Sequence, residues 1–163
     1  APDSGRVLKK KITVGKFRRG QTYLDDLKKE KYGVGALAEK IILSDVFKCW
    51  KIPSDLMMVS VIGSWLGLSP DSEYSEVLSG AISRKLDIPT LEVVPVSRTA
   101  LKPLSANIPP LYVAHQPIHY RGQQLIMTLT YVDGVMRIDT VDITKTKFGP
   151  NDRFIFTEPM PRV

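Results

Sequence analysis

A chain of 163 residues, of which 43% are hydrophobic and 25% charged, predicts a globular domain with a substantial core and excludes a disordered protein. Its one cysteine, Cys49, excludes an internal disulfide framework and is typical of a reducing compartment. The excess positive charge lies at the N-terminal end: residues 1–31 hold ten basic and four acidic side chains, whereas the remaining 132 hold 13 of each.

This basic segment predicts contact with an anionic partner, such as a phosphate backbone, acidic lipid or an acidic protein. The alternative is a solvated strand whose lysines protect a sheet edge against pairing with another chain. Phe17 and Tyr23 lie among the basic residues and offer rings on which the bases of a single-stranded nucleic acid can stack. Packing inside the domain is the alternative role for both rings.

The first predicted element is a strand over residues 7–17. Ile12 and Val14 fall on one face of this strand, and Lys9 and Lys11 fall on the other.

Four helices are predicted next, over residues 22–31, 37–50, 54–65 and 71–86. Thr22, three residues before Asp25, resembles a helix cap, and Ser54 after Pro53 can cap the third helix. The fourth helix is the clearest, because acidic residues lie near its start and basic residues near its end, as the helix dipole favours.

The second half of the chain predicts strands over residues 91–96, 111–120, 123–143 and 153–156. Residues 97–110 form a proline-bearing loop, and Pro117 places the second of these strands at a sheet edge. The third is a hairpin around Asp133-Gly134, the favoured pair for a type I′ turn.

The order of these elements predicts an α+β fold in which an antiparallel β-sheet packs against two to four α-helices. We expect a single domain over residues 1–163, with residues 1–6 flexible. The chain starts at Ala1-Pro2 without an initiator Met, which leaves open whether a native N-terminal tail is missing. Residues 56–68, the longest nearly apolar stretch, fall short of the about 20 residues of a bilayer-spanning helix.

Two patterns that resemble chemical sites have a structural explanation. His115 and His119 form H-x-x-x-H, but in an extended segment they stand roughly 13 Å apart, too far to share a metal ion. Residues 33–38 match G-x-G-x-x-A but lack the buried strand that a dinucleotide site needs before it, so they are expected to join two helices. The sequence therefore predicts no catalytic residue, metal site, cofactor or small-molecule substrate.

A P-P-x-Y sequence at Pro109, Pro110, Leu111 and Tyr112 is of the kind that docks in extended form on WW-type domains. Docking requires exposure. Because this sequence leads directly into a predicted strand, the alternative is that Tyr112 packs within the domain.

Three features of the sequence resemble one family. A lysine-rich first strand, V-L-K-K-K-I-T-V at residues 7–14, precedes a turn and helices. Residues 48–68 form an aromatic and aliphatic segment with a glycine-rich end. The most specific feature is Tyr120-Arg121-Gly122, followed by a strand with alternating threonines over residues 125–131 and the turn Asp133-Gly134. Together they resemble the matrix proteins of rhabdoviruses, especially the short ones of plant-infecting members.

The resemblance implies a non-enzymatic structural protein that lies beneath the viral envelope in the virion, and in the cytoplasm and at inner membrane surfaces of infected cells. Its implied activities are to self-associate, to condense the nucleocapsid and to link it to the inner face of the envelope during budding. Its implied partners are further copies of itself, the viral nucleoprotein–RNA complex, an anionic membrane surface and the viral glycoprotein tail. The residues expected to contact anionic lipid or nucleocapsid are Lys9, Lys10, Lys11, Lys16, Arg18 and Arg19. The residues expected in a self-association loop are Leu101, Leu104 and Ile108.

The chain also departs from this family. The long basic N-terminal tail of the family is absent, and the proline-rich motif usual in that tail lies here in the middle of the chain. Membrane attachment is therefore less supported than self-association. The alternative is a basic nucleic-acid-binding or capsid-like structural protein, which would use the same basic segment.

Overall fold

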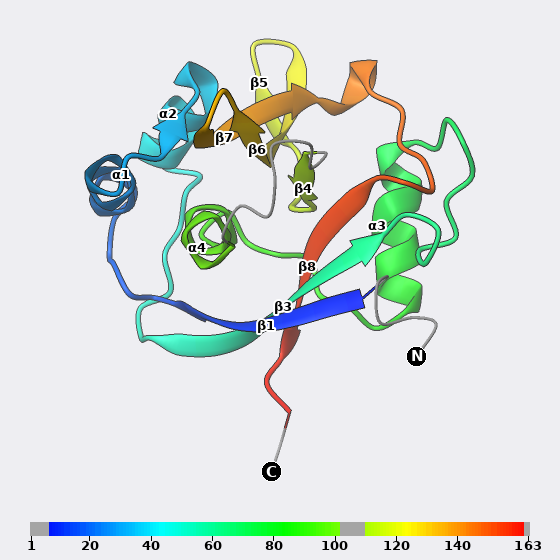
Figure 1. Ribbon diagram of the computed structural model, residues 1–163, viewed down its shortest axis with the longest axis horizontal. Coiled ribbons are helices and arrows are strands. Elements are labelled where there is room, and N and C mark those ends of the chain that lie inside the picture. The colour runs from blue at the N-terminus through cyan, green and yellow to red at the C-terminus, as the bar shows by residue number, and fades with distance from the viewer. Residues whose placement is uncertain (1–6, 102–109, 162–163) are drawn as a thin grey trace.

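Eight strands form one mostly antiparallel sheet with four helices packed against it in the computed structural model, which describes residues 7–101 and 110–161 (Figure 1). The strands are β1 Val7–Val14, β2 Gly33–Val34, β3 Ser54–Ile62, β4 Leu111–Val113, β5 Ile118–Tyr120, β6 Gln123–Val132, β7 Val135–Asp142 and β8 Arg153–Pro159. The helices are α1 Gly20–Lys29, α2 Ala36–Leu43, α3 Tyr74–Ser83 and α4 Val93–Ala100, with a 3₁₀ turn at Ile143–Lys145. The expected α+β class is confirmed.

The strands follow the order β1-β3-β8-β4-β6-β7-β2, and β5 adds to β6. Neighbouring strands are antiparallel except for two parallel pairs, β4 with β8 and β2 with β7. Strand β8, from the C-terminal end of the chain, thus lies inside the sheet between β3 and β4, and β1 lies at one end of the sheet.

Two cores fill the two faces of this sheet. Helices α1, α2 and α4 cover one face, and α3 covers the other (Figure 1). Strand β8 serves both cores, because Ile155 belongs to the first and its neighbours Phe154 and Phe156 belong to the second, as the alternation of a strand requires.

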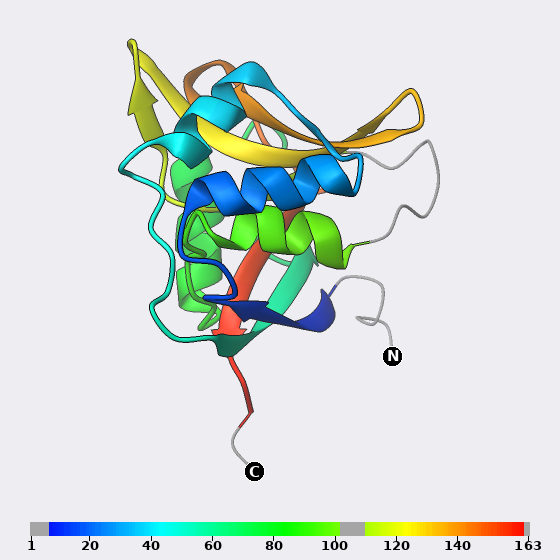
Figure 2. The ribbon, with the colours of Figure 1, turned by 90° about the vertical axis from the view of Figure 1, so that its left-hand side faces the viewer.

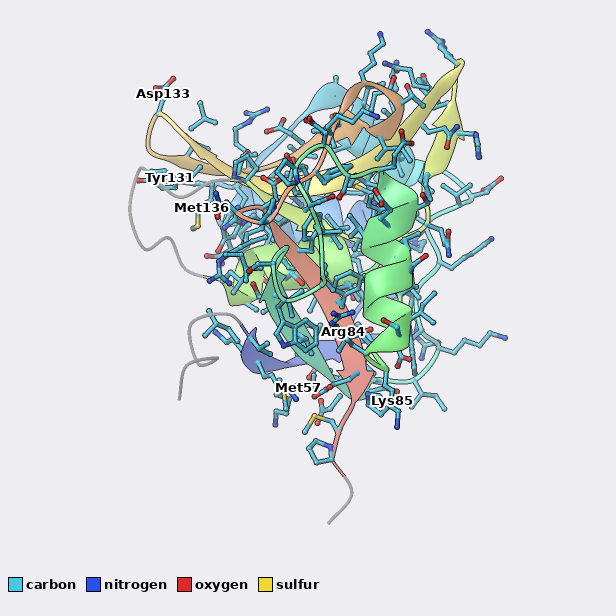
Figure 3. The ribbon with its side chains drawn as sticks, turned by 90° about the vertical axis from the view of Figure 1, so that its right-hand side faces the viewer. Met57, Arg84, Lys85, Tyr131, Asp133 and Met136 are labelled. Carbon is cyan, nitrogen blue, oxygen red and sulfur yellow. The ribbon has the colours of Figure 1, made fainter. Side chains whose placement is uncertain are left out.

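Several expected elements are confirmed. The first strand, the hairpin and the clearest helix form, and α3 begins with a capping box between Glu73 and Glu76. Asp133 and Gly134 both have positive φ, 50° and 80°, as a type I′ turn needs, and Figure 3 shows Asp133 at the hairpin tip. The cap expected at Thr22 is wrong, since α1 begins two residues earlier without a side-chain cap.

The helix expected over residues 54–65 is instead strand β3. Both of its faces are covered: Met58 packs in the first core and Val59 in the second. A strand buried on both faces shows a continuous apolar run without alternation, which cannot be distinguished from a buried helix by periodicity. Ser54, expected as a cap, pairs with Val14 at the start of the strand.

The strand expected over residues 91–96 is wrong as well, because most of it belongs to α4. Val93 and Val94 are fully buried, so these branched side chains indicate burial and not a strand. Pro95 is tolerated because it lies in the first turn of the helix, where the backbone N–H has no acceptor within the helix.

Three boundaries also differ. Helix α2 ends at Leu43, and the chain continues irregularly where a helix was expected to reach Trp50. The strand expected over residues 111–120 divides into β4 and β5 around Pro117, and β4 lies between β8 and β6 and not at an edge. The last strand reaches Pro159 and occupies the middle of the sheet.

Two glycines that face each other give a matched test of this packing. A Cβ built on Gly63 would lie 2.1 Å from the carbonyl oxygen of Gly149, whereas a Cβ on Gly149 would meet open space. We expect Gly63→Ala to lower the free energy of unfolding by about 1–3 kcal/mol, because backbone atoms must shift to relieve the clash. Gly149→Ala should change it by less than about 0.5 kcal/mol. Urea titrations of both variants measure this difference, and equal midpoints would contradict the close approach.

Candidate functional site

The basic side chains of β1 lie on both faces of a strand at the end of the sheet. Ile12 and Val14 are buried on one face, and Lys9 and Lys11 alternate with them on the other. The ammonium group of Lys9 forms an ion pair with Glu158, at an Nζ–Oε1 distance of 2.7 Å. The strand edge itself is therefore lysine-rich, as the edge-protecting alternative also predicts.

The other expected basic residues lie on β1 and in the turn that follows it. Lys10 donates to the carbonyl oxygen of Ala100 at the end of α4. Lys16, Arg18 and Arg19 are exposed in the turn over residues 15–19, between β1 and α1. All six expected basic residues are thus exposed, and within the described chain no acidic side chain pairs with the three in the turn.

The aromatic rings of this region pack inside the domain. Tyr23 is 4% exposed and makes edge contacts with Phe17 and Phe47, at ring-centre distances of 4.9 and 5.9 Å. Tyr23 therefore packs inside the domain, and the face of its ring is not free for base stacking. The ammonium group of Lys16 lies 5.2 Å from the centre of the Phe17 ring.

A buried carboxylate ties the turn to the segment that connects α2 with β3. Glu92 is fully buried and accepts hydrogen bonds from the backbone N–H of Gly15 at 2.6 Å, the backbone N–H of Trp50 at 2.8 Å and the hydroxyl of Tyr23. Buried N–H groups need acceptors, so this one side chain fixes where the two segments meet. No local sequence pattern indicates this role, because Glu92 is distant along the chain from all three donors.

Burial and this carboxylate suppress nucleophilic chemistry nearby. Burial, reinforced by the hydrogen bond to Glu92, raises the pKa of the Tyr23 hydroxyl far above its ordinary value. Burial and the negative charge of Glu92 raise the pKa of the Cys49 thiol to about 11. The thiol is therefore protonated at neutral pH, unlike that of a catalytic cysteine.

Exposed apolar side chains follow one another along the segment from α2 to β3. Leu43, Val46, Trp50 and Ile52 are 49, 50, 40 and 73% exposed. Figure 2 shows this segment running down the outer side of the molecule from α2 to β3, beside the turn from β1 into α1. A Cβ on Gly15 would lie 2.6 Å from the carbonyl oxygen of Ile52, which places the two segments in contact.

We refer to this region as the apolar-basic surface. It consists of Leu43, Val46, Trp50 and Ile52 with the exposed basic residues Lys16, Arg18, Arg19, Lys48 and Lys51. The sequence pattern V-F-K-C-W-K-I over residues 46–52 was the available signal, since two lysines are interspersed there among large apolar residues. Because a continuous helix was expected over residues 37–50, this pattern was not interpreted as an exposed surface.

A groove of about 460 Å³ adjoins this surface, with Cys49 and Trp50 on one side and His115 on the other. The His115 ring has no free nitrogen: Nε2 accepts from the N–H of Met127 at 2.9 Å, so Nδ1 donates to the carbonyl of Gln116 at 2.7 Å. Burial lowers the pKa of His115 to about 4. Neither the thiol nor the imidazole that lines the groove is therefore set up as a base or a nucleophile.

The structure also shows where the histidine pattern and the glycine pattern of the sequence lie. His119 is exposed on β5 while His115 is buried, and the described ranges contain no cluster of three or more His, Cys, Asp or Glu side chains that could hold a metal. The glycine pattern gives only the two-residue strand β2 and then Gly35 before α2, not a buried strand that leads into a helix. Within residues 7–101 and 110–161, every helix is too short or too polar to span a bilayer.

The P-P-x-Y sequence enters the sheet. Tyr112 lies in β4, which pairs with β6 and β8, and its ring stacks on Phe154 at 5.5 Å and meets Phe148 edge-on at 5.1 Å. Docking on a WW-type domain would require this ring to leave its partners, so the packing favours the structural alternative. Pro110 is exposed, and Pro109 lies outside the described residues.

The expected self-association loop is only partly described. Leu101 is half-buried and packs against the first core. Leu104 and Ile108 lie outside the described residues, so their expected role stays a prediction.

Comparison of the chain with protein-family models, with curated proteins and with solved structures gives no match.

Proposed function

We propose that the chain is a non-enzymatic, matrix-type assembly protein, the role that its resemblance to rhabdovirus matrix proteins implies. In this role it self-associates, condenses a nucleoprotein–RNA complex and links that complex to the inner face of a viral envelope. The observation that carries the proposal is the apolar-basic surface, where large apolar side chains and cations are exposed together. Reversible attachment to an anionic surface needs both, because charge or a single apolar anchor alone binds marginally.

The chemistry of the groove supports a binding role over catalysis. Its thiol has a raised pKa, and its imidazole has both ring nitrogens in hydrogen bonds. An active site of the acyl-transfer or hydrolytic kind would need the opposite arrangement, with an activated nucleophile and an accessible base.

A nucleic-acid-binding or capsid-like role is the second candidate. The basic residues of the turn favour it, because they have no acidic partner among the described residues and such cations suit a phosphate backbone. The buried ring of Tyr23 and the aliphatic residues of the apolar-basic surface find no use in this role.

Sedimentation velocity of the purified chain, free of lipid and nucleic acid and over a range of salt, tests the assembly role. We expect reversible growth into large species as the protein concentration rises, because subunits that assemble head to tail form open polymers. A strict monomer at every salt and concentration would contradict it. Steeply salt-dependent binding to single-stranded RNA by such a monomer would then support the second candidate.

A further inference from the structure

We propose that the apolar-basic surface is a bilayer contact, in which Trp50 and Ile52 enter the interface of an anionic membrane while the surrounding lysines and arginines bind lipid phosphates. This inference rests on the proposed function and deepens it. It moves the main membrane contact from the lysines of β1 to the segment between α2 and β3.

The exposure of these side chains is built into the fold. Ile52 is 73% and Trp50 40% exposed, although the backbone N–H of Trp50 is anchored to the buried Glu92. The anchor leaves the indole at the surface, where it lines the rim of the groove. The apolar side chains are thus presented on a fixed backbone, and contact with a membrane requires no refolding of the segment.

The charged side chains of the two segments are mostly positive. Lys48 and Lys51 come from the same segment, and the turn over residues 15–19 adds three more basic side chains. Asp45 is the acidic residue within the two segments. A surface that combines a tryptophan, a large aliphatic residue and a basic rim matches the composition of protein segments that lie in the membrane interface.

The arrangement favours a bilayer over a protein partner or a nucleic acid. Cores of protein interfaces are depleted in lysine, yet here Lys48 and Lys51 lie between exposed apolar residues of the same segment. At a membrane the lysine stems lie along the apolar surface while their ammonium groups reach the phosphates. A nucleic acid would use the cations and the indole but would leave Val46 and Ile52 in water.

Co-sedimentation of the full chain with vesicles tests the apolar contact. The vesicles contain phosphatidylcholine with phosphatidylserine, or phosphatidylcholine alone. We expect the chain to bind the anionic vesicles, and Trp50→Ser and Ile52→Ser each to lower the partition coefficient about tenfold. The matched control is Ile82→Ser, which removes an isoleucine that is 62% exposed on α3, against the other face of the sheet, and should leave binding unchanged.

A second pair of variants tests the charges. Lys48→Gln with Lys51→Gln should weaken binding to anionic vesicles by about fivefold for each charge removed. Lys85→Gln with Lys145→Gln removes the same charge from exposed positions elsewhere and should have little effect; Figure 3 shows Lys85 beyond α3. In a Trp65→Phe background, Trp50 is the sole indole, and its emission should shift to the blue and be quenched by brominated acyl chains.

The outcomes separate this inference from the proposed function. If the chain binds anionic vesicles but Trp50→Ser and Ile52→Ser bind as tightly as the wild type, the inference is overturned and membrane attachment through the basic strand stands. If the wild-type chain assembles but binds no vesicle, both the inference and the membrane part of the proposed function fail. Unchanged urea midpoints ensure that each loss of binding reflects the missing side chain.

Discussion

Replacing Glu92 with leucine is expected to lower the free energy of unfolding by about 3–5 kcal/mol, a large part of the about 5–15 kcal/mol that holds a typical domain folded. Leucine fills similar space but leaves the N–H groups of Gly15 and Trp50 and the hydroxyl of Tyr23 without their acceptor. Each buried donor that loses its acceptor costs about 1–3 kcal/mol. Urea titration followed by circular dichroism measures the change.

Two milder variants should lower the free energy of unfolding by less than Glu92→Leu does. In Glu92→Gln the amide oxygen can serve Gly15 and Tyr23, which share Oε2, while the amide nitrogen faces the N–H of Trp50 and cannot accept from it. We therefore expect Glu92→Gln to cost about 1–2 kcal/mol, less than leucine. Tyr23→Phe removes a donor and leaves the carboxylate with two, so its effect should be smaller than that of leucine. A leucine variant as stable as the wild type would show that Glu92 does not tie the two segments together.

Local patterns were sufficient for the elements that carry their own signals. The hairpin was predictable because Asp133-Gly134 accepts the positive φ of its turn. Helix α3 was predictable because Glu73 and Glu76 lie at its start and Arg84 and Lys85 directly follow its end. Strand β3 and helix α4 were misassigned because both are buried by distant parts of the chain. Apolar residues such as Val59 and Val93 report burial, and burial alone does not separate a central strand from a packed helix.

The candidate site was only half visible in the sequence. Lys16, Arg18 and Arg19 could be identified from the charge asymmetry alone. Their neighbours Trp50 and Ile52 could not be placed beside them, because the contact depends on Glu92, 77 residues from Gly15 and 42 from Trp50. A buried glutamate is recognised by the donors around it, and those come together only in the folded chain.

The same tie links stability to the proposed membrane contact. Glu92 holds the turn and the segment from α2 to β3 in one place, so cations and apolar side chains from two separate parts of the chain act on one surface. Presentation of this surface therefore depends on a residue that touches no lipid itself. Substitutions at Glu92 and at Ile52 act on different properties, the first on folding and the second on binding.

Acidification from pH 7 to pH 4 is expected to destabilise the fold through His115. Burial lowers the pKa of His115 in the folded chain to about 4, from about 6.5 in the unfolded chain, and outweighs the hydrogen bond to Gln116. Above about pH 6.5 both states are neutral, and the full stability is present. As the pH falls toward about 4 the unfolded state binds the proton first, so the free energy of unfolding declines by about 3 kcal/mol.

The two histidines of the chain provide the matched comparison, because carboxylates also titrate in this range. His115→Gln keeps an acceptor for the N–H of Met127 and a donor for Gln116 but removes the titrating group, so its stability should fall less steeply between pH 6.5 and 4. His119→Gln alters an exposed side chain on β5 and should keep the wild-type pH dependence. Urea titrations of the three proteins at several pH values give the slope of stability against pH for each. Identical slopes for His115→Gln and the wild type would show that another group governs the acid sensitivity of the fold.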